Sequence, residues 1–232
     1  MILKNAVIIV LAATLSGAAL AQDDMGEVIV TAQRTSADYY ADEQPVIGLK
    51  RTADSAVQAV EITSDSREED VRKREIQAML EAAIKRASAA GVELVTGDFE
   101  LVQVTLANYK ELIFRSGNRP DTSEVGFFVK SKLDGSTGSA QTRIDNFITS
   151  VPATGRSLIE KQGGLTLTII NPDQYRDQIV KLVSTEAIKY AGFFGADYGV
   201  DVSGLDQQLS WSQASGTEVF LYIPYRFSIK PK

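Results

Sequence analysis

The order of hydrophobic and polar positions after residue 45 predicts alternating strands and helices. Runs with β-branched residues at every second position predict strands, and apolar residues three and four apart predict helices. Strands are expected over residues 53–65, 124–133, 165–170, 200–213 and 217–230, and residues 92–104 are expected to form a strand pair or a strand with a bulge. Helices are expected over residues 66–90, 142–151 and 172–192. This order predicts an α+β fold whose helices pack on a mostly antiparallel sheet.

Capping and turn residues mark the ends of these segments. Ser66 is expected to cap the first helix, and Gly91 to end it. Asn171 and Pro172 combine a good cap with a residue that suits the first helical position. We expect them to begin the last helix directly.

Glycines and one proline mark the ends and irregularities of the strands predicted in the second half of the chain. Gly163-Gly164 is expected to open the strand at 165–170, and Ser215-Gly216 to form a hairpin turn between the last two strands. Phe220 and Tyr222 fall on one face of the final strand, where packing or a subunit contact explains them. Pro224 indicates an edge or a bulge, and such an edge strand would suit an oligomer interface.

The first residues have the pattern of an export signal. Lys4 gives a positive start, residues 6–20 are almost wholly apolar or small, and 19–21 (Ala-Leu-Ala) match the pattern that signal peptidase reads. The apolar stretch is short for a bilayer core of about 30 Å, which needs about 20 helical residues. We therefore expect a signal peptide over 1–21 and a periplasmic mature protein, soluble or loosely associated with the outer membrane.

An acidic leader is expected between the signal and the body, over residues 22–45. It carries several carboxylates against Arg34 alone and ends at Pro45. Such a composition predicts a flexible segment. A single β-branched run, Val28-Ile29-Val30, interrupts it. The remaining residues, 46–232, are expected to form the folded body.

The segment Gly26–Arg34 resembles the TonB box, by which outer-membrane receptors engage the energy-transducing protein TonB. The resemblance implies that the C-terminal domain of TonB accepts this segment as an added strand. The binding residues would be Glu27, Val28, Ile29, Val30, Thr31 and Ala32. In the alternative interpretation, Glu27–Ala32 is the first strand of the folded body. A complete TonB-dependent receptor is excluded, because its plug and barrel of 22 strands need a far longer chain.

Composition argues against several classes of function. The chain has 24 Lys and Arg against 30 Asp and Glu, and this negative balance speaks against a nucleic-acid partner. It has no His and no Cys, which excludes Ser-His-Asp and Cys-His catalysis and the usual zinc sites. The densest acids, Asp23-Asp24 and Glu68–Asp70, suit a solvated leader and the first turn of a helix. We expect no catalytic residue, no metal site and no cofactor.

The body resembles the SIMPL-domain family of bacterial periplasmic and outer-membrane-associated proteins over residues 47–229. The segments that carry the resemblance are 53–57 (Ala-Asp-Ser-Ala-Val), 89–92 (Ala-Ala-Gly-Val), 96–101 (Thr-Gly-Asp-Phe-Glu-Leu), 124–133, 165–171, 173–194 and the closing hairpin. The resemblance implies two β-α-β-like halves, and for some members a ring-like homo-oligomer. Two departures are the acidic leader and a shortened, loop-like region at 152–156.

These observations together predict a non-enzymatic periplasmic adaptor. Its body would serve an outer-membrane or envelope complex, as a homo-oligomer, and its leader would recruit TonB. The alternative is an envelope-stress or chaperone-like oligomer with no TonB link. A further hypothesis is a protein that binds a small ligand, which would need an apolar pocket.

Overall fold

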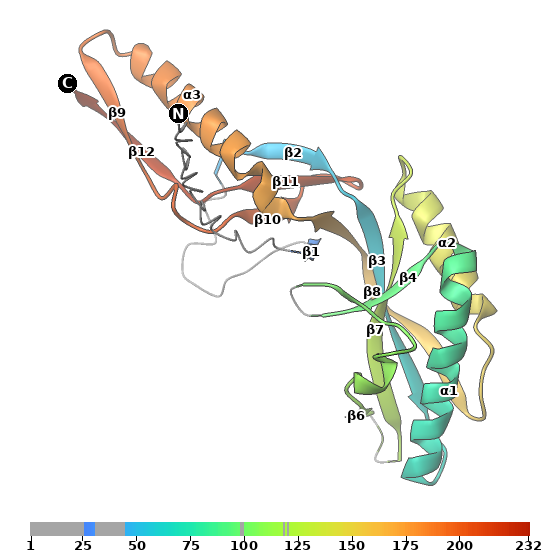
Figure 1. Cartoon of the computed structure of the whole chain (residues 1–232). Coiled ribbons are helices and arrows are strands. Elements are labelled where there is room, and N and C mark those ends of the chain that lie inside the picture. The colour runs from blue at the N-terminus through green and yellow to red at the C-terminus, as the bar shows by residue number, and fades with distance from the viewer. Residues whose placement is uncertain (1–25, 31–44, 98–99, 118, 120) are drawn as a thin grey trace, which may run out of the picture.

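The computed structural model describes residues 26–30, 45–97, 100–117, 119 and 121–232. Within these residues the fold is α+β, with helices packed on mostly antiparallel sheets as predicted. Figure 1 shows an elongated molecule of two lobes, with the long strands β3 and β8 running along the first lobe and toward the second. The predicted signal peptide and most of the acidic leader lie outside the described residues.

The main sheet of the first lobe curls into a half barrel. Its strands follow the order β1-β8-β3-β7-β4-β5, every neighbouring pair is antiparallel, and β6 pairs with β7. Their bounds are β1 (Glu27–Val30), β3 (Ser55–Ser64), β4 (Glu93–Thr96), β5 (Val102–Gln103), β6 (Arg115–Ser116), β7 (Ser123–Lys132) and β8 (Ser157–Ile170). Of the two forms predicted for residues 92–104, the structure has the strand pair, β4 with β5.

Two helices cover one face of this sheet (Figure 1). They are α1 (Glu69–Ala87), which continues into the short turn η1 (Ser88–Ala90), and α2 (Thr137–Ser150). Apolar side chains at spacings of three and four give α1 a buried stripe, as the pattern predicted. The largest fully buried members of the first core are Ile62, Ile76, Met79, Leu80, Leu94, Ile144 and Phe147.

The second lobe is built on two small sheets and one helix. Its elements are β2 (Leu49–Thr52), η3 (Pro172–Tyr175), α3 (Arg176–Gly192), β9 (Tyr198–Ser203), β10 (Ser210–Gln213), β11 (Glu218–Tyr222) and β12 (Arg226–Pro231). One sheet has the order β10-β11-β2, and the other pairs β12 with β9. A second core joins the end of β8 to α3 and the first of these sheets, and its members include Val28, Ile169, Ile179, Leu209, Trp211 and Leu221.

The start of the first helix differs from the prediction, whereas its end agrees. Helix α1 begins at Glu69 after Glu68, and no side chain caps it. The Ser66 hydroxyl instead donates to Glu75 at 2.8 Å, because a carboxylate is a stronger acceptor than a neutral group. Gly91 ends the helical segment with φ of 67°, and its N–H donates to Ser88 at 3.1 Å. Helix α2 also begins earlier than predicted, at Thr137.

Strand β8 begins at Ser157, so Gly163-Gly164 does not open it. These glycines lie where the pairing with β3 shifts register between Gln58 and Ala59. Gly163 has φ of 64°, a conformation that favours glycine, and the Gln58 amide fills the irregularity by donating to Gln162 at 2.9 Å. The glycine pair therefore marks a bulge inside one long strand.

The last helix and the last strands are each more divided than predicted. Asn171 takes the left-handed conformation, and its side chain makes no capping hydrogen bond to the helix. Pro172 begins the short turn η3 ahead of α3. The predicted strands at 200–213 and 217–230 each split into two. Strand β2, which the pattern did not reveal, covers the edge of β11 opposite β10, so Phe220–Tyr222 does not form a sheet edge.

Candidate functional site

The candidate site is the strand β1, which contains Glu27, Val28, Ile29 and Val30 of the predicted TonB-binding residues. Thr31 and Ala32 lie outside the described residues. Strand β1 forms one edge of the main sheet and pairs antiparallel with the C-terminal end of β8. In the described structure the segment is therefore part of the folded body, as the alternative interpretation holds.

Alternation along β1 divides its side chains between two environments. Val28 and Val30 are fully buried in the second core, where Leu167, Ile169 and Trp211 are also buried. Ile29 lies on the opposite face and is partly exposed. The β-branched run thus supplies one apolar face, and this face is what attaches β1 to the body.

The outer edge of β1 is also occupied. The Glu27 carbonyl accepts a hydrogen bond from the Leu101 N–H at 2.8 Å, and Val28 forms a bridge with Glu100. The Ile29 carbonyl accepts from the Trp211 indole N–H at 3.2 Å. Because both edges of β1 have partners, another strand cannot add to β1 while it stays in place.

A charged cluster holds the Glu27 side chain. Glu27 lies 2.6 Å from the Lys130 ammonium group, which also lies 2.8 Å from Glu93, and the Thr168 hydroxyl donates to Glu27. The Glu27 and Lys130 side chains keep only 10% and 16% of their surface exposed. Burial alone lowers the pKa of Lys130, but its bonds with Glu27 and Glu93 outweigh burial and raise the pKa above the ordinary lysine value. Lys130 is therefore charged at neutral pH.

No local pattern in the sequence pointed to Lys130 or Trp211. Lys130 lies in β7 and Trp211 in β10, far from β1 along the chain. They meet β1 only because the order of strands and the curl of the sheet bring them there. Contacts of this kind depend on register, which a single sequence does not reveal.

A cavity of about 710 Å³ lies next to this cluster. Its lining includes Asp54, Glu93, Gln103, Lys130 and Lys132, together with apolar residues at the end of α1 and in β4. The lining mixes both signs of charge with apolar groups and indicates no particular ligand.

Of the two acidic runs, only Glu68–Asp70 can be placed, and it lies apart from β1. Asp23-Asp24 falls outside the described residues, and Glu68–Asp70 is exposed at the start of α1. There Glu69 forms an ion pair with Lys73 at 2.6 Å, and acids in a first turn favour the helix dipole. Across the part of the chain that the structure describes, no three carboxylates gather in a way that could hold a metal ion.

Among the described helices, none is long and apolar enough to cross a membrane. Comparison of the chain with protein-family models, with curated proteins and with solved structures gave no match. The basis for a function is therefore the sequence pattern of residues 26–34 and the geometry around β1.

Proposed function

We propose that this protein is a non-enzymatic adaptor of the cell envelope that recruits the C-terminal domain of TonB through its first strand. The binding segment comprises Glu27, Val28, Ile29, Val30, Thr31 and Ala32. The exported body serves an outer-membrane or envelope process, such as transport or secretion, and the first strand links that process to TonB.

The observation that supports this proposal is that β1 already behaves as an added edge strand within its own chain. It pairs with β8 along four residues and places Val28 and Val30 in an apolar site. Its acidic first residue is held by Lys130. Main-chain pairing together with pockets for alternate side chains is how an extended segment adds to the sheet of another protein. A sheet edge of TonB would bind the same features.

Recruitment requires an exchange, because both edges of β1 are occupied in the body. Strand β1 must leave β8 before TonB can pair with it. Residues 31–44 separate β1 from Pro45, and the part from Gln33 to Gln44 can reach on the order of 40 Å at about 3.3 Å per residue. Since β2 begins only at Leu49, release of β1 does not require β2 to unfold.

We also propose that the body is SIMPL-like and forms a homo-oligomer. The order β3-α1-β4 followed by β7-α2-β8 supports two β-α-β-like halves. The two-stranded sheet of β9 and β12 supports the oligomer, because each of its strands has only one neighbour among the described strands. Unpaired sheet edges of this kind readily pair with a second chain.

The test is capture of the mature chain by immobilised TonB C-terminal domain. We expect the unmutated protein to be captured and Val30→Pro to be lost, because proline removes a main-chain donor from the added strand. Val30→Pro also disfavours β1 in its place on β8, so the variant segment is released more readily. Loss of capture would therefore mean that the segment no longer pairs with TonB, and not that β1 stays bound to β8.

The matched control is Ser36→Pro, which places a proline after the motif. This variant should be captured as well as the unmutated protein, and both proline variants should keep the circular dichroism of the body. No capture of the unmutated chain, or equal capture of Val30→Pro, overturns the proposal.

A second candidate is an envelope-stress or chaperone-like oligomer in which β1 is purely structural. Complete burial of Val28 and Val30 favours it, because such residues ordinarily belong to a permanent core. In that case neither the unmutated chain nor Ser36→Pro is captured by TonB, while Val30→Pro lowers the thermal stability of the second lobe.

A further inference from the structure

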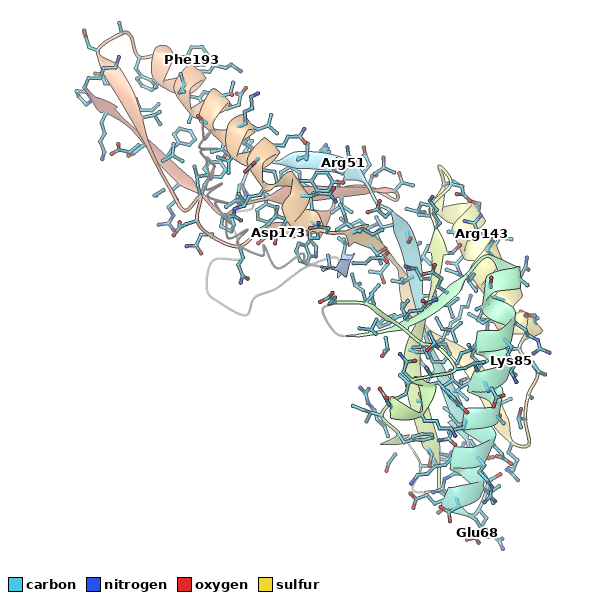
Figure 2. All side chains as sticks on the ribbon, in the orientation of Figure 1. Arg51, Glu68, Lys85, Arg143, Asp173 and Phe193 are labelled. Atoms are coloured by element: carbon cyan, nitrogen blue, oxygen red, sulfur yellow. The ribbon has the colours of Figure 1, made fainter. Side chains whose placement is uncertain are left out.

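The far end of the second lobe carries a cluster of exposed apolar side chains. Phe193 and Phe194, which directly follow α3, expose 73% and 61% of their surface. Ile188 on α3 exposes 62%, and Tyr198 at the start of β9 exposes 38%. Figure 2 shows Phe193 at one extreme of the molecule, opposite the end that carries Glu68. We call residues 193–198 the aromatic tip.

Two tyrosines contact the phenylalanines. Tyr190 packs edge-on against Phe193 with ring centroids 6.1 Å apart, and Tyr198 lies 5.9 Å from Phe194. On its other side, Tyr190 stacks on Phe227 of β12 at 6.0 Å. The purely apolar rings are the more exposed ones, and the rings with a hydroxyl group are more covered.

The first part of the tip and the segment that leads into it carry no charge. No charged residue occurs from Tyr190 to Ala196. Within the tip, the Ala196 carbonyl accepts a hydrogen bond from the Lys232 ammonium group at 2.8 Å, and the Lys189 ammonium nitrogen lies 5.8 Å from the centroid of the Tyr190 ring. Glu186 pairs with Lys189, and Asp197 is the acid within the tip.

We infer that the aromatic tip inserts into the interfacial region of a phospholipid bilayer. Phe193 and Phe194 would enter the edge of the acyl region. Tyr190 and Tyr198 would lie at the level of the headgroups, where amphipathic rings are favoured. Lys189 and Lys232 would meet the phosphates. The tip would bind the bilayer whether or not β1 recruits TonB.

The shape of the tip favours a lipid surface over a second copy of the chain. A narrow arm is made of α3 and the β9–β12 sheet (Figure 1), and Phe193 lies at its end (Figure 2), next to Phe194 in the chain. A protein partner would have to offer a cavity for both rings, whereas a bilayer accepts a projecting apolar loop of any outline. The cavity of about 710 Å³ lies in the first lobe and is lined partly by charged groups, so it does not match such rings.

The experiment is flotation of the mature protein with vesicles of phosphatidylethanolamine and phosphatidylglycerol in a ratio of about 3 to 1. We expect the unmutated protein to float with the vesicles. Phe193→Ser with Phe194→Ser should reduce the partition coefficient, on the order of tenfold for each phenylalanine. The matched control, Ile113→Ser with Leu158→Ser, removes exposed apolar residues of the first lobe and should float as the unmutated protein does.

A second measurement uses Phe193→Trp. Trp211 is the single tryptophan and is buried, so bromine-labelled lipids should quench mainly the indole introduced at position 193. Equal flotation of the Phe193→Ser, Phe194→Ser variant and the unmutated protein, or no quenching of Phe193→Trp, overturns insertion. Insertion is also overturned if the unmutated protein does not float and the double serine variant loses self-association. That result would assign the tip to a contact between copies of the chain.

Discussion

Lys130→Met is expected to increase the affinity of the mature protein for the TonB C-terminal domain, on the order of 100-fold. The substitution leaves the Glu27 carboxylate without its cation in a place where only 10% of the side chain is exposed. Breaking a buried pair from one side costs about 3 kcal/mol or more. This cost destabilises only the state in which β1 is paired with β8, because water solvates the Glu27 carboxylate once β1 is released.

The affinity follows from the population of released strand. If TonB binds only chains in which β1 has left β8, the apparent Kd equals the intrinsic Kd divided by the released fraction. A cost of about 3 kcal/mol to the docked form raises that fraction by roughly 100-fold, because 1.4 kcal/mol is a factor of ten. The Kd is measured by titration of labelled TonB C-terminal domain.

The control is Lys132→Met, which removes an exposed lysine from the same strand. It should leave the Kd of the unmutated chain unchanged. Equal values for Lys130→Met and Lys132→Met would show that the ion pair does not restrain the binding segment, and would contradict the exchange mechanism.

Phe147→Ala is expected to destabilise the body by about 3 to 5 kcal/mol, the range for removing a buried phenylalanine ring. Phe147 lies on α2 and is 1% exposed, in the same core as Ile62, Ile76 and Ile144. The cost combines lost apolar burial with a cavity between α2 and the sheet, which the long strands β3 and β8 cannot close without losing their pairing.

Urea unfolding followed by circular dichroism measures this effect. Phe193→Ala is the matched control, because it is the same substitution at a side chain that is 73% exposed, and it should stay within about 0.5 kcal/mol of the unmutated protein. A loss below about 1 kcal/mol for Phe147→Ala would mean that α2 does not close the first core as described.

The sequence predicted those elements whose signals are local. The stripe of α1, the stop at Gly91 and the turn at 215–216 depend on neighbours along the chain, and the structure agrees with them. Short strands such as β2 were missed, because Leu49–Thr52 is largely exposed and becomes a strand only through its pairing with β11.

The candidate site was predictable only in part. The alternation of Glu27–Val30 marked a strand, but nothing near it in the chain indicated whether β1 would be free or paired. That outcome depends on β8, Lys130 and Trp211, which reach β1 through the order of the sheet. A pairing register over such separations is not encoded in any local pattern.

If TonB binds as proposed, β1 must leave β8 first, and a reversible disulfide between the two strands tests this requirement. Ile29 and Thr168 lie opposite each other in the β1–β8 register. The Gly26 carbonyl accepts from the Asn171 N–H at 3.1 Å, so the alternation of the ladder leaves Ile29 and Thr168 without mutual hydrogen bonds. Their Cα atoms are then about 4.5 Å apart, within the range that a disulfide spans.

The measurement is capture of Ile29→Cys with Thr168→Cys by TonB C-terminal domain before and after reduction. The chain has no natural cysteine, so within one chain only the intended disulfide can form. We predict no capture of the oxidised protein and a clear gain of capture after reduction. Equal capture of the oxidised and reduced forms would contradict the claim that TonB binds a released β1.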